Sequence, residues 1–192
     1  MSKKLVFCLA LLTIGVWVIS CVPPFYGTAR IEPGWHVDVG LATDVVRPLK
    51  YGDFPNFPRA ELGIRHGFKE SFQINGRIGI VYMGGDGLPV VPVAGLGVQA
   101  AAPLGIVTPA FGVEVSFPPT FTPTFLLGIG GNETATLGVR LHIFPDWVRG
   151  GLICMPDAFI TGHLRSRLSI FAGVGLFIDA PVVTLGVGYK IK

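Results

Sequence analysis

Residues 72–82 read Phe-Gln-Ile-Asn-Gly-Arg-Ile-Gly-Ile-Val-Tyr, with an apolar side chain or a glycine at every second position from Phe72 to Tyr82. The residues between them are mostly polar or glycine, and Arg77 lies in the middle of this second set. Side chains of a β-strand point alternately to opposite faces of the sheet. This period of two therefore predicts a strand with one apolar and one polar face.

The same alternation returns from Gly34 to the C-terminus, and no segment has the 3.6-residue period of a long amphipathic helix. Residues 150–156 fit either a loop or a strand. Ten strands are predicted, near residues 34–46, 58–67, 71–83, 91–101, 106–117, 121–130, 134–144, 158–164, 168–177 and 182–191. We therefore expect an all-β protein, an antiparallel up-and-down β-barrel of about ten strands, within a range of eight to twelve.

Three features of the strands favour a transmembrane barrel, with its apolar face toward lipid and its polar face in the lumen. The apolar face is almost free of charge. The polar face carries glycines, which weaken a strand but leave room in a narrow lumen: Gly40, Gly63, Gly79, Gly112, Gly138, Gly173, Gly175, Gly186 and Gly188. Aromatic residues near the strand ends suit interfacial girdles: Trp35, Tyr82, Phe117, Phe121, Phe144, Phe177 and Tyr189.

One predicted hairpin resembles the hairpins of a known class of protein. Residues 62–67, Leu-Gly-Ile-Arg-His-Gly, are followed by a turn and then by residues 72–77, Phe-Gln-Ile-Asn-Gly-Arg. This pattern resembles the hairpins of bacterial outer-membrane β-barrel proteins, and a similar pattern extends over most of residues 34–191. The resemblance implies a barrel that spans the bacterial outer membrane.

The N-terminus has the layout of a secretory signal. Lys3 and Lys4 precede an uncharged apolar run over residues 5–19. Residues 18–21, Val-Ile-Ser-Cys, resemble the lipobox of bacterial lipoproteins. That resemblance implies cleavage before Cys21 and lipidation of Cys21, with palmitate among the fatty acids. Val22 is not the aspartate that often signals retention at the inner membrane, which implies delivery to the outer membrane.

These observations divide the chain into three parts: a lipoprotein signal peptide over residues 1–20, a lipidated tether over residues 21–33 and a β-barrel domain over residues 34–192. The chain is 50% hydrophobic and only 14% charged, and its net charge of +3 is too small to indicate nucleic-acid binding. Cys154 is the one cysteine left besides Cys21 after signal removal, so no intrachain disulfide is expected. Membrane lipid is the expected partner, and the sequence identifies no protein partner.

Six charged residues fall on the polar side of the predicted strands, and we interpret them as one polar network of the lumen: Asp38, Glu61, Arg65, Arg77, Glu114 and Arg140. Three acids against three bases indicate a neutral network, because a charge removed from bulk water needs a partner. The expected role is to fill and brace the lumen; the alternative is a selective path for a small solute or ion.

Enzyme motifs are absent from the sequence, which has no nucleophile elbow, phosphate-binding glycine loop or Cys-x-x-Cys. We expect no catalytic residue. The histidines lack metal-ligand spacing, so no metal ion or cofactor is expected either: His36, His66, His142 and His163.

Three hypotheses for the function follow. The first is a lipid-anchored outer-membrane β-barrel with a structural, adhesive or narrow-channel role and no catalysis. The second is a soluble lipocalin-like barrel, tethered by Cys21, which binds an apolar ligand; the Gly-x-Trp signature of lipocalins is missing, because Gly34 and Trp35 are adjacent. The third is an outer-membrane barrel enzyme acting on lipid or peptide.

Overall fold

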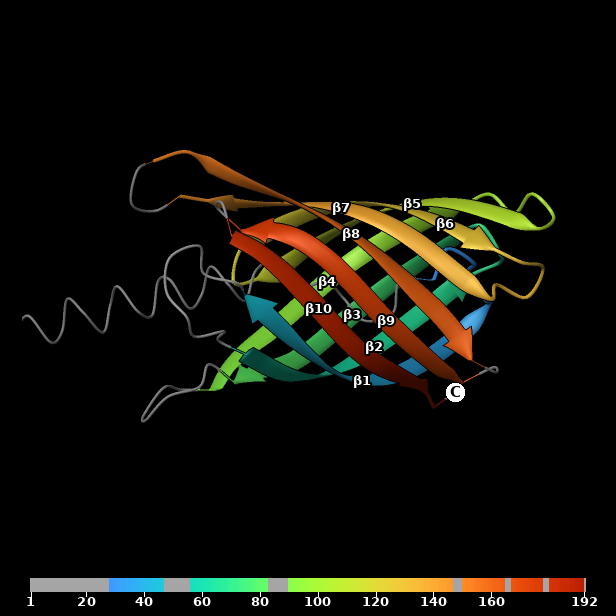
Figure 1. Cartoon of the computed structure of the whole chain (residues 1–192). Helices are drawn as coiled ribbons and strands as arrows, with labels where there is room; N and C mark the ends of the chain where they lie inside the picture. The colour runs from blue at the N-terminus through green and yellow to red at the C-terminus, as the bar shows by residue number, and fades with distance from the viewer. Residues whose placement is uncertain are drawn as a thin grey trace, which may run out of the picture.

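Ten antiparallel strands close into a single barrel in the computed structural model of the chain (Figure 1). The structure describes residues 28–46, 56–82, 90–146, 150–164, 167–177 and 180–191. Each strand pairs with its sequence neighbours, and the first pairs with the last. The strands are β1 (Gly34–Val46), β2 (Asn56–Phe68), β3 (Phe72–Tyr82), β4 (Val90–Ala101), β5 (Val107–Phe117), β6 (Thr120–Ile129), β7 (Ala135–Pro145), β8 (Leu152–Leu164), β9 (Leu168–Phe177) and β10 (Ala180–Lys190).

The barrel closes along β1 and β10, whose register runs from Asp38 opposite Lys190 to Val46 opposite Val182. Because the strands run alternately up and down, every second connection lies at the same end. The start of β1, the end of β10 and the turns after β2, β4, β6 and β8 share one end, which we call the N-terminal mouth. The connections after the odd-numbered strands share the opposite end, which we call the loop end.

The outward face of this barrel is apolar. Leu96 is 75% exposed, Leu41 62% and Val139 51%, and similar side chains surround the wall on all ten strands. The buried side chains of the same strands include aspartate, glutamate, arginine and threonine. A soluble ligand-binding barrel has the opposite arrangement, so the structure confirms the predicted transmembrane type of barrel. No helix in the described residues is long and apolar enough to cross a membrane.

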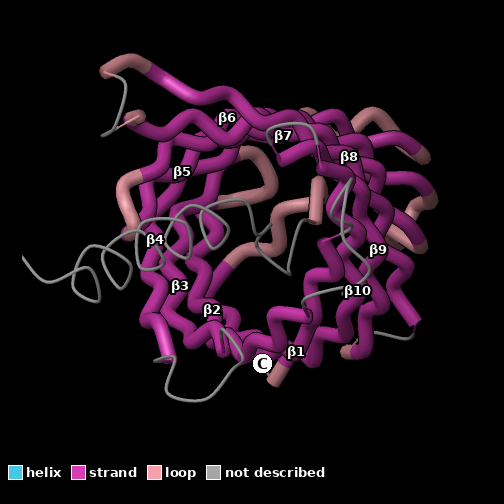
Figure 2. The backbone as a smooth tube through the Cα atoms, turned by 60° about the vertical axis from the view of Figure 1, so that its left-hand side comes forward, coloured by secondary structure: helices cyan, strands magenta, loops and turns pink. Residues whose placement is uncertain are grey.

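The lumen is filled in layers. Phe57, Val81 and Val93 form an apolar cluster toward the loop end. Charged side chains from β2, β3, β5, β7 and β8 form ion pairs in the middle. A second apolar cluster lies toward the N-terminal mouth and consists of Ala29, Ala110, Leu126, Phe159 and Phe171. Figure 2 looks into the ring of strands and shows loop backbone inside it.

Glycines on the lumen face make this filling possible, as the sequence predicted. A Cβ atom at Gly138 would lie 2.1 Å from the ring of Phe159. At Gly79 it would lie 2.6 Å from the Cγ atom of Glu61. Larger side chains therefore need these glycines as neighbours, because atoms cannot overlap in a close-packed interior.

Two predictions about individual elements were wrong. The eighth strand begins at Leu152, six residues before its predicted start at residue 158, so Asp157 belongs to the lumen wall and not to a loop. Of residues 150–156, which fit either a loop or a strand, residues 152–156 belong to β8, and Pro156 lies on its outward face. Phe144 is not part of an aromatic girdle: it alternates in phase with Arg140 and His142, and its side chain is buried in the lumen. Trp35, Tyr82, Phe117, Phe121 and Tyr189 do point outward, and the side chain of Phe177 lies outside the described residues.

Val139→Arg tests the direction of the outer face. Val139 lies midway along β7 and points outward, where an arginine in the middle of the bilayer costs about 2–4 kcal/mol. Ile191→Arg makes the same kind of change beyond the end of β10, where the cost falls to about 0–1 kcal/mol. Heat-modifiable gel mobility after insertion into vesicles should show a large loss of folded barrel for Val139→Arg alone. Equal folding of both variants would contradict the assignment of the lipid face.

Candidate functional site: the filled lumen and its mouth

Arg77 is the central charge of the lumen. Its guanidinium group donates to Glu61 across one strand boundary (Nη1 to Oε1, 2.9 Å) and to Glu114 on the other side (Nη2 to Oε1, 2.7 Å). A Cβ atom at Gly95 would meet Arg77 Nε at 3.1 Å and Glu114 Oε1 at 2.8 Å, so this glycine opens the path between them. Arg59 adds a second cation to Glu61, at 3.3 Å. Four charges from β2, β3 and β5 thus form one buried cluster.

A second buried cluster lies on β7 and β8. Arg140 Nε donates to Asp157 Oδ1 (3.0 Å), and His142 Nε2 lies 2.9 Å from Asp157 Oδ2. The guanidinium group of Arg140 also lies 4.0 Å from the centre of the Phe159 ring, a cation–π geometry. His142 reaches Thr122 on β6 through its Nδ1 atom (3.2 Å). The cluster therefore connects three strands.

The third group stands nearer the N-terminal mouth. Arg65 Nε and Nη2 donate to the two carboxylate oxygens of Asp38, at 2.8 and 3.1 Å, in a bidentate pair. The structure thus places all six predicted network residues in the lumen, in three ion-paired groups. It adds Arg59, His142 and Asp157, which sequence reasoning did not include. Arg59 and His142 alternate in phase with Glu61 and Arg140, and that phase would have identified them, whereas Asp157 lies just outside the predicted eighth strand.

The segment from Thr28 to Pro33 occupies the N-terminal mouth, although the sequence predicted a tether for it. Gly34, with φ of +95°, turns the chain from β1 into this segment. Ala29 and Ile31 are 0% and 1% exposed. A Cβ atom at Gly67 would lie 2.1 Å from the carbonyl oxygen of Glu32, so the segment packs directly on the inner wall. We call residues 28–33 the plug.

Glu133 fixes the plug from the turn between β6 and β7. Its Oε1 atom accepts from the backbone N–H of Ala29 (2.6 Å), and its Oε2 atom accepts from that of Arg30 (2.9 Å). Glu133 adopts φ of +49°, a left-handed conformation that is uncommon for a residue with a side chain. No local pattern in the sequence indicates this contact, because its partners are more than one hundred residues apart.

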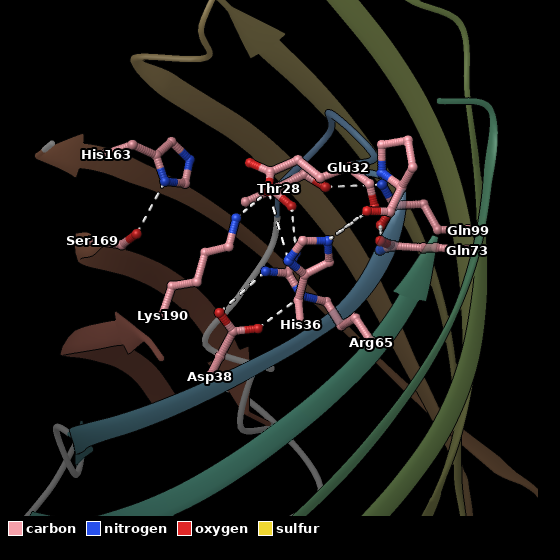
Figure 3. A network of polar contacts seen from close by, with 11 residues as sticks. Thr28, Glu32, His36, Asp38, Arg65, Gln73, Gln99, His163, Ser169 and Lys190 are labelled. Atoms are coloured by element: carbon pink, nitrogen blue, oxygen red, sulfur yellow. Dashed lines mark hydrogen bonds and ion pairs between the residues drawn. The ribbon is translucent and has the colours of Figure 1, made fainter. Parts of the chain in front are cut away.

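Side chains of β2 and β4 bond the plug from the opposite side, and a side chain of β3 supports them. Gln99 Nε2 donates to the carbonyl oxygens of Thr28 (2.8 Å) and Ala29 (3.2 Å). Gln73 Nε2 donates to Gln99 Oε1 (3.1 Å), and Arg65 Nη1 donates to Thr28 Oγ1 (2.8 Å). Figure 3 shows these side chains converging on the plug from neighbouring strands. The plug is therefore bonded on both sides by buried polar groups.

A directed chain of hydrogen bonds reaches Glu133 from β9. A carboxylate only accepts, so Thr136 Oγ1 donates to Glu133 Oε1 (2.5 Å). The Thr136 oxygen then accepts from His163 Nε2 (2.9 Å), which leaves His163 Nδ1 to accept from the Ser169 hydroxyl (3.0 Å). This order fixes one tautomer of His163. These hydrogen bonds connect β7, β8 and β9 at the N-terminal mouth.

Glu32 and Lys190 form an ion pair at the rim of the mouth. Partial burial on its own raises the pKa of the Glu32 carboxyl, but the hydrogen bond and charge of Lys190, with the charges of His36 and Arg65, outweigh it and hold this pKa below its usual value. His36 Nε2 lies 3.1 Å from the carbonyl oxygen of Glu32. The plug thus ends in polar contacts with both β1 and β10.

A cavity of about 70 Å³ remains between the plug and the charged layer, lined by Arg65, Gln73, Asn75, Gln99 and Thr124 among others. Its size and the polar side chains among its lining residues suit a few ordered water molecules. Arg65 and Gln99, which line this cavity, also bond the plug, and the cluster of Phe57, Val81 and Val93 fills part of the lumen toward the loop end.

No protein-family model matches the sequence, and neither does any curated protein. Among solved structures, the chain is similar to the KdgM porin (11% identity, TM-score 0.48, covering 79% of this chain and 98% of that one). It is also similar to Ail, the attachment invasion locus protein of Yersinia pestis (17%, 0.35, 83% and 100%), and to a de novo designed transmembrane β-barrel (10%, 0.38, 84% and 99%). The assignment to the class of outer-membrane-type β-barrels rests on this chain's own strand pairing and faces.

Arg77→Met should destabilise the barrel by about 3–5 kcal/mol, because Glu61 and Glu114 would remain buried without their shared cation. The double variant Arg77→Met with Glu114→Gln should recover part of that loss, since it also removes one of the two carboxylates. Denaturant unfolding in lipid vesicles measures both free energies. A double variant no more stable than Arg77→Met would contradict the pairing.

Glu133→Ala should release the plug, because the amides of Ala29 and Arg30 lose their acceptor. Hydrogen–deuterium exchange of residues 28–33 should become much faster, while exchange in β3 and β4 stays slow. Glu70→Ala, a change of the same kind in the exposed turn after β2, provides the control and should leave exchange of the plug unchanged. Unchanged exchange in Glu133→Ala would show that other contacts hold the plug.

Proposed function

We propose that the protein is a lipid-anchored β-barrel of the bacterial outer membrane, with a structural, non-catalytic role and a lumen that is closed at rest. One observation carries this proposal: the wall is apolar outside, while the lumen is filled by paired charges and by the chain's own plug. Apolar side chains around a closed barrel stabilise it in lipid and not in water.

The filled lumen supports a structural role over free diffusion of solutes. Arg77, Arg140 and Arg65 each have a carboxylate partner, so their charges are compensated inside the wall. A ten-stranded barrel is little wider than an eight-stranded one, whose side chains nearly fill the interior. Strands joined by such buried pairs form a rigid, closed body.

The predicted lipid at Cys21 would act directly on the plug. Residues 1–27 lie outside the described part of the chain, and Thr28 is the first described residue. The seven residue steps from Cys21 to Thr28 span at most about 25 Å when fully extended. A lipid on Cys21 would therefore hold the plug close to the membrane and restrict how far it can leave the mouth.

A narrow channel is the second candidate function, and the cavity behind the plug favours it. Conduction would require the plug to leave the mouth and the cluster of Phe57, Val81 and Val93 to admit water. Planar-bilayer recordings separate the two functions. We expect little or no current from the wild type. Steady, porin-like currents from the wild type would contradict the closed barrel.

Metabolic labelling with a fatty-acid analogue tests the anchor. The wild-type protein should be labelled and Cys21→Ala should not, because the motif at residues 18–21 resembles a lipobox. Cys154→Ala is the matched control, since Cys154 is an exposed free cysteine of the barrel. Equal labelling of wild type and Cys21→Ala would remove the anchor from the proposed function and leave the barrel itself untouched.

A further inference from the structure

Gly76 differs from the glycines of the lumen. It lies in the middle of β3 on the outward face, between Ile74 and Ile78. Its φ is not in the left-handed region, and a Cβ atom there would make only ordinary contacts, 3.4 Å from Leu96 Cδ2 and 3.9 Å from the carbonyl oxygen of Gly95. Neither the backbone nor the packing of this chain therefore requires a glycine at this position.

The missing side chain at Gly76 opens a groove in the outer wall. Two adjoining hollows of about 430 and 340 Å³ are both lined by Ile64, Gly76 and Leu96. The first extends toward Phe117 at the loop end, and the second extends toward Trp35 at the N-terminal mouth. Each falls in the range of roughly 300–1,000 Å³ that is typical of small-molecule sites. The groove thus runs from one rim of the apolar wall toward the other.

An aromatic cluster marks the end of the groove at the N-terminal mouth. The ring of His66 lies 4.5 Å from that of Trp35 and 4.6 Å from that of Phe68, and the Phe68 ring lies 6.0 Å from that of Phe72. The buried Nδ1 atom of His66 has no hydrogen-bond partner among the described residues. Trp and other amphipathic rings are typical of the level at which lipid headgroups meet hydrocarbon.

We propose that this groove binds one membrane phospholipid, with an acyl chain over Gly76 and the headgroup beside Trp35 and His66. The inference rests on the proposed function, because the groove is continuous with the wall that faces lipid. An empty groove in hydrocarbon loses dispersion contacts on its whole lining, and water cannot replace them. A linear acyl chain fits a narrow apolar groove that crosses the wall in the direction in which acyl chains run.

Two substitutions fill the groove and one provides a control. Gly76→Leu and Ala94→Leu each add an apolar side chain to its lining, and both sites face outward. Gly162→Leu makes the same change on β8, away from the groove, where a Cβ atom meets nothing within 4 Å. All three variants should fold, as heat-modifiable mobility can show, because each adds only apolar surface to a lipid-facing wall.

Native mass spectrometry of the delipidated full-length protein, titrated with phosphatidylethanolamine, measures the binding. Wild type and Gly162→Leu should bind one phospholipid tightly, and both groove-filling variants should bind it about tenfold more weakly. Equal binding by all four proteins would overturn the proposal. A two-copy complex that forms without phospholipid and is lost in Gly76→Leu would overturn it too, in favour of a second copy as the occupant. Failure of the wild type to fractionate with membranes would instead contradict the proposed function.

Discussion

A polypeptide backbone that lies in hydrocarbon has no water to bond, so every strand must find hydrogen-bond partners within the chain. The pairing of β1 with β10 meets this constraint by closing the sheet, and the other features of the molecule depend on that closure. Ten strands define a narrow lumen, and in a narrow lumen large side chains need small neighbours. Gly138 beneath the ring of Phe159 and Gly95 beside Arg77 are consequences of this restriction.

The narrow lumen also requires that its buried charges be paired. A charge cannot remain unpaired where water is scarce, which explains why Arg77 is shared by Glu61 and Glu114 and why Asp157 serves both Arg140 and His142. The plug belongs to the same arrangement, because Glu133 and Gln99 use buried polar groups to bond its backbone. Packing inside the barrel does not explain the outward Gly76, whose missing side chain leaves a groove in the outer wall.

The sequence predicted those parts of the structure that local alternation encodes. The period of two fixed the strand number, the outward apolar face and the lumen position of the six charged residues, because phase along a strand determines the face. Asp157 was missed because the predicted eighth strand began only at residue 158, whereas β8 begins at Leu152 and accommodates Pro156 on its outward face. Phe144 was assigned to the aromatic girdle because it lies near a strand end. Its alternation in phase with Arg140 and His142 indicates the lumen face instead. The contact of Glu133 with Ala29 joins distant segments through a single turn residue, and no periodic pattern encodes it.

In the membrane, lipid should surround the alternating apolar face and should be excluded from the lumen. Nuclear Overhauser effects between lipid acyl-chain protons and side-chain methyl groups test this most directly, in a methyl-labelled sample in lipid nanodiscs. We expect strong effects at Val139, Leu96 and Leu185, which point outward, and none at Leu126 and Val81, which are buried in the lumen. Acyl-chain contacts at Leu126 and Val81, with water contacts at Val139, would contradict it.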